Sequence, residues 1–325
     1  MNALENKTIL LTGGTGSFGN KFTEIVLKKY KPKVIRIFSR GEKKQYDMDN
    51  KFKDDRLRFF IGNVRDKNRL HRAMNDVDIV IHAAALKQVP ACEYNPIEAV
   101  RTNVNGTINV IDTAIDNEVD RVIAISTDKA VHPVNLYGAT KMTAEKLFVQ
   151  GNSYAGKTKT KFSCVRYGNV IGSRGSVIPL FLEQKKKGVI TITDEKMTRF
   201  WIKLEQGAEF VINCIDRMKG GEIFVPKIPS MKITDLADAI APKAKINVIG
   251  IRPGEKIHEV LLTEDESRHT REFAEFFAIE PEHPFWNEKR LNSGKKIPMG
   301  FTYSSDNNKK WLTKDDILKT INESR

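Results

Sequence analysis

The chain has 325 residues, 40% of them hydrophobic and 29% charged, a balance typical of a soluble globular protein with a sizeable core. Its formal net charge is +13, but the lysines are scattered and no nucleic-acid-binding motif occurs, so we expect no nucleic-acid partner. No apolar run approaches the roughly 20 residues that span a bilayer, and three widely spaced cysteines favour reduced thiols. We therefore expect a cytoplasmic protein with no membrane span, no disulfide and no metal site.

The first predicted strand, residues 8–12, leads into a glycine-rich turn and then into a helix. Glycines at every third position allow a tight turn, a close approach of backbone N–H groups to a pyrophosphate, and near packing of the helix on the strand. This arrangement predicts dinucleotide binding, with a turn that holds no ligand as the alternative. The candidate cofactor-binding residues here are Gly13, Thr15, Gly16, Ser17, Phe18 and Gly19.

The end of the second predicted strand, residues 34–38, indicates which dinucleotide binds. An acid about 20 residues beyond the glycines is typical of NAD binding, whereas an arginine accommodates the 2′-phosphate of NADP. Arg40 occupies that place, after Ser39 and close to Lys43 and Lys44. These four residues predict NADP as the cofactor, unless Arg40 is merely exposed.

The third and fourth strands are predicted over residues 58–61 and 78–81. The small residues after the fourth strand, including Ala84, would let a cofactor lie close to the backbone. Lys87 is placed to meet a phosphate, with a surface lysine as the alternative. His82 has no partner nearby in the sequence, so we predict a structural role for it.

The chain is organised around residues 121–141, which follow a helix predicted over residues 96–118. A buried strand, residues 122–125, stops at hydroxyl and charged side chains. Tyr137 and Lys141 then open a second helix on one face, a turn apart. An adjacent ammonium would lower the pKa of a tyrosine from about 10 toward the range of a useful base. The candidate catalytic residues are Thr127, Asp128, Lys129, Tyr137 and Lys141, although a Tyr-Lys pair on a helix surface would show the same spacing.

Strands and helices alternate from residue 8 to a sixth strand at residues 162–166, which predicts an α/β fold with a doubly wound parallel Rossmann sheet. We expect residues 1–166 to form the NADP-binding domain, with residues 202–225 packing back on it. Residues 167–325 should form mainly a smaller C-terminal substrate-binding part. From residue 167 onward the sequence reads as loops, residues 204–218 are predicted to be helical again, and after residue 262 the sequence carries little signal.

Eight segments now carry a resemblance: TGGTGSFG, HAAALK, STDKA, YGATK, RYGNVIGSRGSV, MTRFW, EIFVPKIPSMK and RPGEK, spread over residues 12–256. The chain resembles the extended short-chain dehydrogenase/reductase superfamily and, within it, the inverting UDP-N-acetylglucosamine 4,6-dehydratases. The resemblance implies a nucleotide-sugar lyase that uses NADP catalytically and inverts carbon 5 of UDP-N-acetylglucosamine. It also implies the first step toward pseudaminic acid or a related glycan sugar, and a homo-oligomer, either dimer or hexamer.

The pair Asp128-Lys129 distinguishes members of that superfamily, because retaining dehydratases resemble this chain but carry Asp-Glu there. The resemblance implies Asp128 as the acid and Lys129 as the base of an elimination that follows oxidation by Tyr137. Lys129 must be neutral to act, and the sequence leaves its ionisation open. Adjacent residues on extended chain point in opposite directions, which would limit the effect of Asp128 on Lys129.

The resemblance also implies the remaining contacts. Asn63 and Val64 would contact the adenine, although Asn63 stands where the family often has Asp and Gly41 where an acid often follows the arginine. The implied substrate-binding residues, which join Lys87, are Asn169, Val170, Arg199, Arg252 and Glu255. Arg252 lies in a basic turn whose guanidinium could clasp a phosphate. An NADP-dependent nucleotide-sugar 4-epimerase and a noncatalytic NADP-sensing module remain the alternatives.

Overall fold

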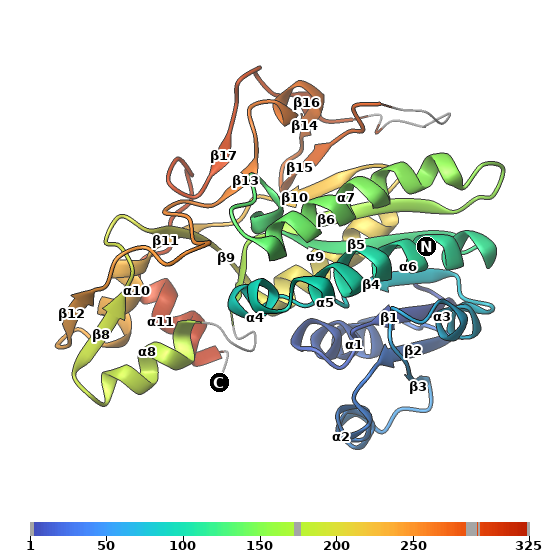
Figure 1. Cartoon of the computed structure of the whole chain (residues 1–325), viewed down its shortest axis with the longest axis horizontal. Coiled ribbons are helices and arrows are strands. Elements are labelled where there is room, and N and C mark those ends of the chain that lie inside the picture. The colour runs from blue at the N-terminus through green and yellow to red at the C-terminus, as the bar shows by residue number, and fades with distance from the viewer. Residues whose placement is uncertain (1–2, 172–176, 284–290, 292, 324–325) are drawn as a thin grey trace.

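The computed structural model describes residues 3–171, 177–283, 291 and 293–323. Its centre is a run of parallel strands: β1 (Thr8–Thr12), β2 (Val34–Ser39), β3 (Leu57–Ile61), β4 (Ile79–His82), β5 (Arg121–Thr127), β6 (Lys161–Tyr167) and β10 (Ile223–Pro226). They lie in the order β10-β6-β5-β4-β1-β2-β3 (Figure 1). The doubly wound parallel sheet predicted from the sequence is confirmed.

From β1 the chain continues to β2 and β3, and it then returns to β4 on the other side of β1. The connection that leaves β1 therefore crosses one face of the sheet, and the connection that reaches β4 crosses the other. Thr12 pairs with both Phe38 and His82, which brings the turns after β1, β2 and β4 to one edge of the sheet. Thr127 at the end of β5 pairs with Tyr167 at the end of β6. Ligands bind at such carboxyl ends, where the connections diverge.

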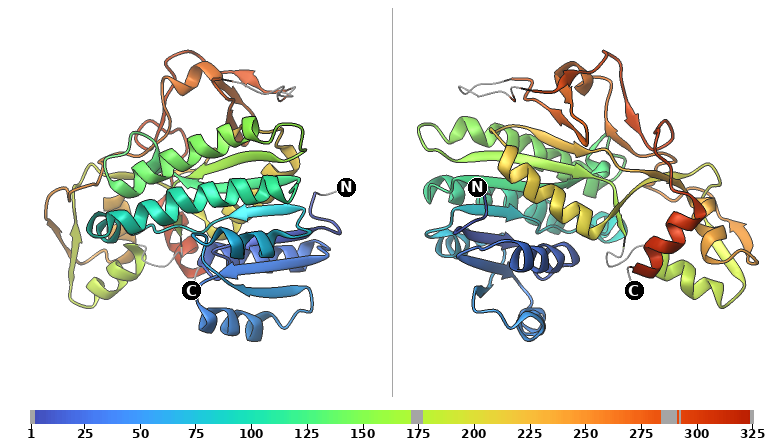
Figure 2. Two further views of the ribbon diagram at one scale, coloured as in Figure 1. Left: turned by 45° about the vertical axis from the view of Figure 1, so that its right-hand side comes forward. Right: turned by 180° about the vertical axis from the view of Figure 1, so that it is seen from behind.

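Helices cover both faces of the sheet (Figures 1 and 2). On one face α1 (Ser17–Lys29) packs against α9 (Leu204–Arg217). On the other, α6 (Gly106–Asp116) packs against α3 (Lys67–Met74) and α7 (Leu136–Tyr154). With α9 and β10 in the large sheet layer, residues 204–226 join the first part of the chain in space.

The helix predicted over residues 96–118 is confirmed as helical segments that follow one another without a break through residue 116. After α4 (Val89–Tyr94), α5 (Pro96–Val100) runs into a π-helical turn at Arg101–Asn105 before α6 begins. The wider turn buries Asn103, whose amide donates to the carbonyl of Leu86 and accepts from its N–H at 2.9 and 2.8 Å. π-turns inside helices are frequent at functional sites, and this one holds the segment that carries Lys87.

Residues after 262, which carried little signal, extend the sheet. Strands β15 (Phe276–Ile279), β14 (Thr270–Glu272) and β16 (Lys295–Lys296) continue antiparallel beyond β10, while β13 (Val260–Leu262) pairs with β17 (Tyr303–Ser304). The buried guanidinium of Arg166 joins this region to α7, because it contacts Glu145 at 2.7 Å and Glu266 at 2.9 Å. An antiparallel strand needs no crossover helix, so this extension leaves no strand–helix alternation in the sequence.

A smaller lobe lies beside the sheet (Figure 1). The expectation of loops from residue 167 is wrong here, since much of the segment is helix or strand. The lobe and its connections contain β7 (Asn169–Ile171), α8 (Val177–Lys185), β8 (Val189–Ile192), β9 (Thr198–Lys203), β11 (Ser230–Lys232), α10 (Ile233–Ile240), β12 (Lys245–Val248) and α11 (Lys314–Glu323). The remaining helix, α2 (Glu42–Phe52), follows β2 and was not predicted. Residues 172–176 of the RYGNVIGSRGSV segment lie outside the described residues.

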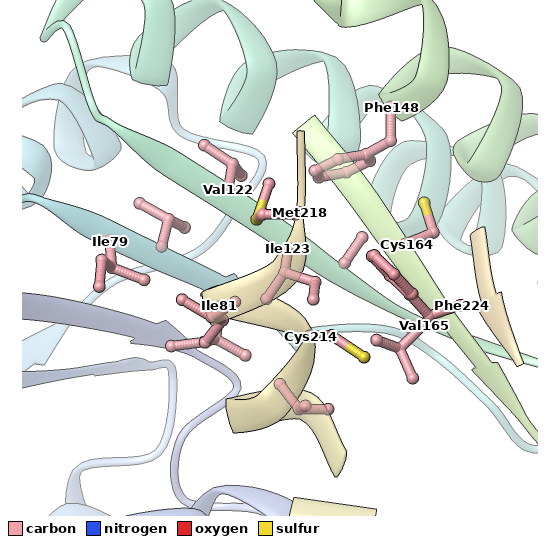
Figure 3. Packing of buried hydrophobic residues seen from close by; sticks show 14 of the residues in the cluster. Ile79, Ile81, Val122, Ile123, Phe148, Cys164, Val165, Cys214, Met218 and Phe224 are labelled. Atoms are coloured by element: carbon pink, nitrogen blue, oxygen red, sulfur yellow. The ribbon is translucent and has the colours of Figure 1, made fainter. Parts of the chain in front are cut away.

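Two hydrophobic clusters divide the interior. In the larger, Ile81, Ile123 and Val165 from three neighbouring strands meet Cys214 of α9 and Phe224 of β10 (Figure 3). Parallel strands covered on both faces are apolar throughout, which explains why they were recognisable. The smaller cluster lies between α8, α10 and α11. The assignment of residues 1–166 to cofactor binding and of residues 167–325 mainly to substrate binding stays a prediction.

The described part of the chain contains neither a membrane-spanning helix nor a group of metal ligands. None of its helices is long and apolar enough to cross a membrane. Within the same residues, no three His, Cys, Asp or Glu side chains are grouped so that they could hold a metal ion.

Candidate functional site

The chain turns sharply where β5 ends, and this turn orients the first three candidate residues. Asp128 begins a 3-10 turn, Asp128–Ala130, and is only 1% exposed. Its Oδ1 accepts from the Thr127 hydroxyl at 2.9 Å and from Lys129 Nζ at 3.0 Å. The expectation that Asp128 and Lys129 point in opposite directions is therefore wrong, because the backbone at these residues is turned rather than extended.

Opposing effects act on the ammonium of Lys129. Burial lowers its pKa, but the carboxylates of Asp128 and Glu259 outweigh burial, and the pKa of Lys129 is raised above its ordinary value. Glu259 Oε1 lies 3.4 Å from Nζ. Lys129 is therefore an ammonium held between two carboxylates.

Helix α7 carries Tyr137 to the same place. Asn135 caps the helix by accepting from the Gly138 N–H at 2.8 Å. A Cβ at position 138 would come within 2.1 Å of the Lys129 carbonyl oxygen, so only glycine lets the helix start against the 3-10 turn. This contact places the tyrosine and the lysine on adjoining elements.

The phenol of Tyr137 is protonated at neutral pH. Burial raises its pKa, the Lys129 ammonium and a hydrogen bond with Thr127 oppose that effect, and the result is a pKa of about 12. The predicted lowering by Lys141 is wrong for this structure. Lys141 instead donates to the Ile125 carbonyl at 2.7 Å, and burial lowers its own pKa.

The glycine turn has the shape needed for a pyrophosphate. Gly13 has φ +68°, and a Cβ there would lie 2.9 Å from backbone atoms of Ala84. A Cβ on Gly19 would come within 2.1 Å of the Gly14 carbonyl oxygen, so α1 can approach the turn only with glycine there. Among the described residues no side chain caps the start of α1 at Gly16, which leaves its first N–H groups available to an anion. These features fit a dinucleotide.

The other predicted cofactor residues ring this turn. Arg40, Lys43 and Lys44 are exposed beyond the end of β2, while Ser39 is buried and accepts from Gln45 at 3.0 Å. Asn63 Oδ1 accepts from the Arg65 N–H at 3.2 Å, and the Val64 side chain is buried. The Ala84 N–H donates to Thr12 Oγ1 at 3.3 Å, which holds the segment after β4 beside the glycines.

Several buried oxygens near the strand ends have no hydrogen-bond partner within the described part of the chain. They belong to Ser126, Asp128, Asn169, Glu255 and Glu259. A buried polar atom without a partner costs about 1–3 kcal/mol, so such a group indicates an absent ligand or water. A hydroxyl-rich ligand would supply the donors. Val170, next to Asn169, is half-buried against the larger hydrophobic cluster.

The predicted phosphate-binding residues differ in their surroundings. Burial and repulsion from Lys129 lower the pKa of Lys87. Arg199 is engaged by the backbone, with hydrogen bonds to the carbonyls of Lys256 at 2.9 Å and Ile257 at 3.0 Å. Arg252 is exposed, and its Nη1 lies 3.9 Å from Oε1 of Glu255. Of the two arginines, Arg252 is therefore the more accessible to an anionic ligand.

Sequence reasoning missed Glu259 and did not single out Lys256 from its turn. Lys256 donates to the Val131 carbonyl, and burial lowers its pKa. Glu259 is 2% exposed, and burial together with Asp128 raises its pKa. The one available signal was the spacing of charges in EKIHE, directly after the RPG turn.

His82 has the structural role that the sequence favoured. Its ring stacks on Phe148, and its two nitrogens lie 2.8 Å from Thr12 Oγ1 and 3.4 Å from Thr107 Oγ1. Burial, with a smaller contribution from Lys141, lowers its pKa to about 3. His82 is neutral and fills the core beneath the site.

Comparisons with known proteins agree with this arrangement. A family model described as polysaccharide biosynthesis protein matches residues 9–281. A protein of Campylobacter jejuni subsp. jejuni serotype O:2, named UDP-N-acetylglucosamine 4,6-dehydratase (inverting), is 53% identical, with 98% of each chain covered. A protein of Rickettsia akari, named UDP-glucose 4-epimerase, is 41% identical over 97% of this chain and 95% of that protein. The X-ray structure of Pen from Bacillus thuringiensis is 40% identical and superposes with a TM-score of 0.88, covering 98% of this chain and 99% of that one.

Proposed function

Because the chain belongs to the polysaccharide biosynthesis protein family, we propose that it is a lyase that acts on UDP-N-acetylglucosamine. It would oxidise carbon 4, remove water across carbons 5 and 6, and invert carbon 5. The product would be UDP-2-acetamido-2,6-dideoxy-L-arabino-hexos-4-ulose, a first intermediate toward pseudaminic acid or a related glycan sugar. The observation that carries the proposal is the convergence of Thr127, Asp128, Lys129 and Tyr137 at the end of β5.

The residues around the glycine turn would hold NADP. The N–H groups at the start of α1 would bind the pyrophosphate, and Arg40 with Lys43 and Lys44 would bind the 2′-phosphate. Asn63 and Val64 would line the adenine, and Lys141 would contact the cofactor from α7. When bound, the nicotinamide supplies a hydride acceptor for carbon 4 of the sugar and later a hydride donor for carbon 6.

Tyr137 would remove the proton from the 4-hydroxyl. Its hydrogen bond with Thr127 and the Lys129 ammonium favour the phenolate, while burial opposes it. Oxidation at carbon 4 leaves a ketone, which acidifies the hydrogen on carbon 5. The chain must then supply a base for that hydrogen and an acid for the departing 6-hydroxyl.

The Asp128–Lys129 pair could supply both groups. Transfer of one proton from Nζ to Oδ1 across 3.0 Å turns the ammonium into an amine and the carboxylate into a carboxylic acid. Lys129 would then take the carbon 5 hydrogen, and Asp128 would protonate the 6-hydroxyl, which leaves as water. Once carbon 6 has received the hydride, a proton from solvent delivered to the opposite face of carbon 5 would complete the inversion.

The UDP part of the substrate would lie toward the smaller lobe. The accessible guanidinium of Arg252 and the ammonium of Lys87 are suited to the diphosphate. Asn169, Val170 and Glu255 would meet the nucleoside or the sugar, since two of them carry partnerless buried oxygens within the described chain. Arg199 would contribute through its charge, because its N–H groups already bind carbonyl oxygens.

A second copy of the chain is proposed as the partner at the outer surface of α4 to α7. That surface exposes large apolar side chains, namely Tyr94, Ile97, Val100, Ile108 and Met142. Exposed apolar patches of this kind mark interaction sites. Light scattering should give at least a dimeric mass, and a monomeric mass would contradict the oligomer.

Incubation with UDP-N-acetylglucosamine and NADP in deuterated water tests the function. The expected product is lighter by one water and carries deuterium at an inverted carbon 5. A product of unchanged mass with inverted carbon 4 would identify a 4-epimerase instead, in line with the Rickettsia relative's name. Cofactor binding without turnover would identify a noncatalytic module.

A further inference from the structure

Glu259 lies directly before β13, and hydrogen bonds hold its backbone in place. The side chain is 3% exposed. Its N–H donates to Ser305 Oγ at 2.9 Å, and its carbonyl accepts from the Ser305 N–H at 2.8 Å. Thr198 Oγ1, at 2.6 Å from Ser305 Oγ, extends this anchor to β9. The carboxylate therefore projects from a rigid support.

The carboxylate faces three cations from three parts of the chain. Glu259 Oε1 lies 3.4 Å from Lys129 Nζ and 3.7 Å from Arg199 Nε, while Oε2 lies 3.9 Å from Lys256 Nζ. Arg199 is itself held by the backbone carbonyls of residues 256 and 257. Because these contacts keep the carboxylate in place, the ammonium of Lys129 is bracketed by Glu259 on one side and Asp128 on the other.

We propose that Glu259 is a positioning residue that holds the Lys129 ammonium opposite Asp128 and controls when that ammonium can give up its proton. The consequence for catalysis rests on the proposed function, in which Lys129 is the base. The control over the proton is a property of the cluster and can be measured without turnover.

The charges around Lys129 give the direction of the effect. The groups that act on it from every side are Asp128, Glu259, Arg199, Lys256, Lys87 and the phenol of Tyr137. Replacing the carboxylate of Glu259 by an amide would leave one carboxylate against three other cations. A charge within about 4–6 Å shifts a pKa by about 1–3 units, so Glu259→Gln should lower the pKa of Lys129 by at least about one unit.

The experiment follows the lysine Cε resonances of the full-length protein by NMR as the pH rises. Lys129 is identified as the resonance missing from Lys129→Arg. In the wild type this resonance should keep its ammonium position over the pH range in which the protein is folded. In Glu259→Gln it should begin to move toward the amine position at the alkaline end of that range, whereas unchanged behaviour would overturn the proposal.

Two further variants sharpen the comparison. Glu264→Gln removes an exposed carboxylate from the same segment and should behave as the wild type. Glu259→Asp keeps the charge but places it farther from Lys129 Nζ. The pKa of Lys129 should therefore fall in this variant too, by less than in Glu259→Gln. If Glu259→Gln fails to fold, as judged by circular dichroism, the aspartate variant decides, and a wild-type titration curve there would refute the proposal.

The dehydration assay separates this inference from the proposed function. The ascending limb of the pH–rate profile should move to lower pH in Glu259→Gln and stay in place in Glu264→Gln. A protein that titrates as expected but forms no dehydrated sugar would overturn the proposed function alone. Normal dehydration with an unmoved limb and an unmoved resonance would overturn the role of Glu259 alone.

Discussion

The Nζ atom of Lys129 lies 3.0 Å from Oδ1 of Asp128, the residue that precedes it in the chain. Such a contact between neighbours requires the backbone to turn, and the 3-10 turn after β5 provides it. This ion pair therefore contains both the proton and the proton acceptor that an elimination needs.

Lys129→Met should lower dehydration at least about 100-fold, because general acid–base groups contribute about 10²- to 10⁴-fold. NADP affinity should be unchanged, since the glycine turn follows β1 whereas Lys129 follows β5. Product formation is measured by NMR and cofactor binding by calorimetry. Lys146→Met, on the exposed side of α7, is the matched control. Near-normal turnover in Lys129→Met would remove this lysine from the mechanism.

Gly13→Ala should abolish NADP binding, because its Cβ would lie 2.9 Å from the Ala84 backbone. Gly188→Ala is the matched control, with φ +70° against +68° at Gly13 and no atom within 4 Å of its Cβ among the described residues. The left-handed backbone should cost each variant about 1–2 kcal/mol of unfolding free energy. Only Gly13→Ala should lose the cofactor, and calorimetric binding equal to that of Gly188→Ala would contradict the proposed pyrophosphate site.

Arg40→Ala should weaken NADP binding by about tenfold or more while leaving NAD binding unchanged, because a hydrogen bond to a charged group contributes about 1.5–3 kcal/mol. Arg72→Ala removes another exposed arginine and serves as the control. Both affinities are measured by fluorescence titration. An equal loss for the two dinucleotides would mean that Arg40 does not read the 2′-phosphate.

Arg252→Ala should weaken UDP binding measured by calorimetry, by about tenfold if the guanidinium contacts a phosphate. Arg268 offers a close control, since both arginines are exposed, at 53% and 57%, and each faces an acid three residues away. Arg268→Ala should bind UDP as the wild type does. Unchanged affinity in Arg252→Ala would refute its assignment.

His82 should make the protein acid-sensitive. Its pKa is about 3 in the fold against 6.5 for the free side chain, so the unfolded chain takes up the proton first as the pH falls through 6.5. From about pH 7 to about pH 5, linkage predicts a loss of about 2 kcal/mol of unfolding free energy from this group. His82→Gln should lack that loss, as measured by urea unfolding, whereas the exposed His71→Gln should retain it. Equal losses in the two variants would contradict the prediction.

The sequence by itself determined the parallel sheet, the glycine turn and the residues that end β5. Each depends on local order: apolar strands read as continuous runs, glycine spacing reflects the space beside one strand, and a helix brings residues 137 and 141 to one face. The resemblance carried by the eight segments added the reaction and the substrate class. The π-helical turn inside the helix predicted over residues 96–118 could not be predicted, because the Asn103 side chain there binds the backbone of Leu86, which lies outside that helix.

The tertiary structure alone decided the ionisation of the site. The pKa of Lys129 is raised by the neighbouring Asp128, which only a turned backbone brings near, and by Glu259, which is remote from Lys129 in the sequence. Tyr137 is influenced by Lys129 rather than by the lysine at helical spacing. Electrostatic energies depend on distance and burial, and neither quantity is set by separation along the chain, so periodicity and motif spacing could name these residues but not their charges.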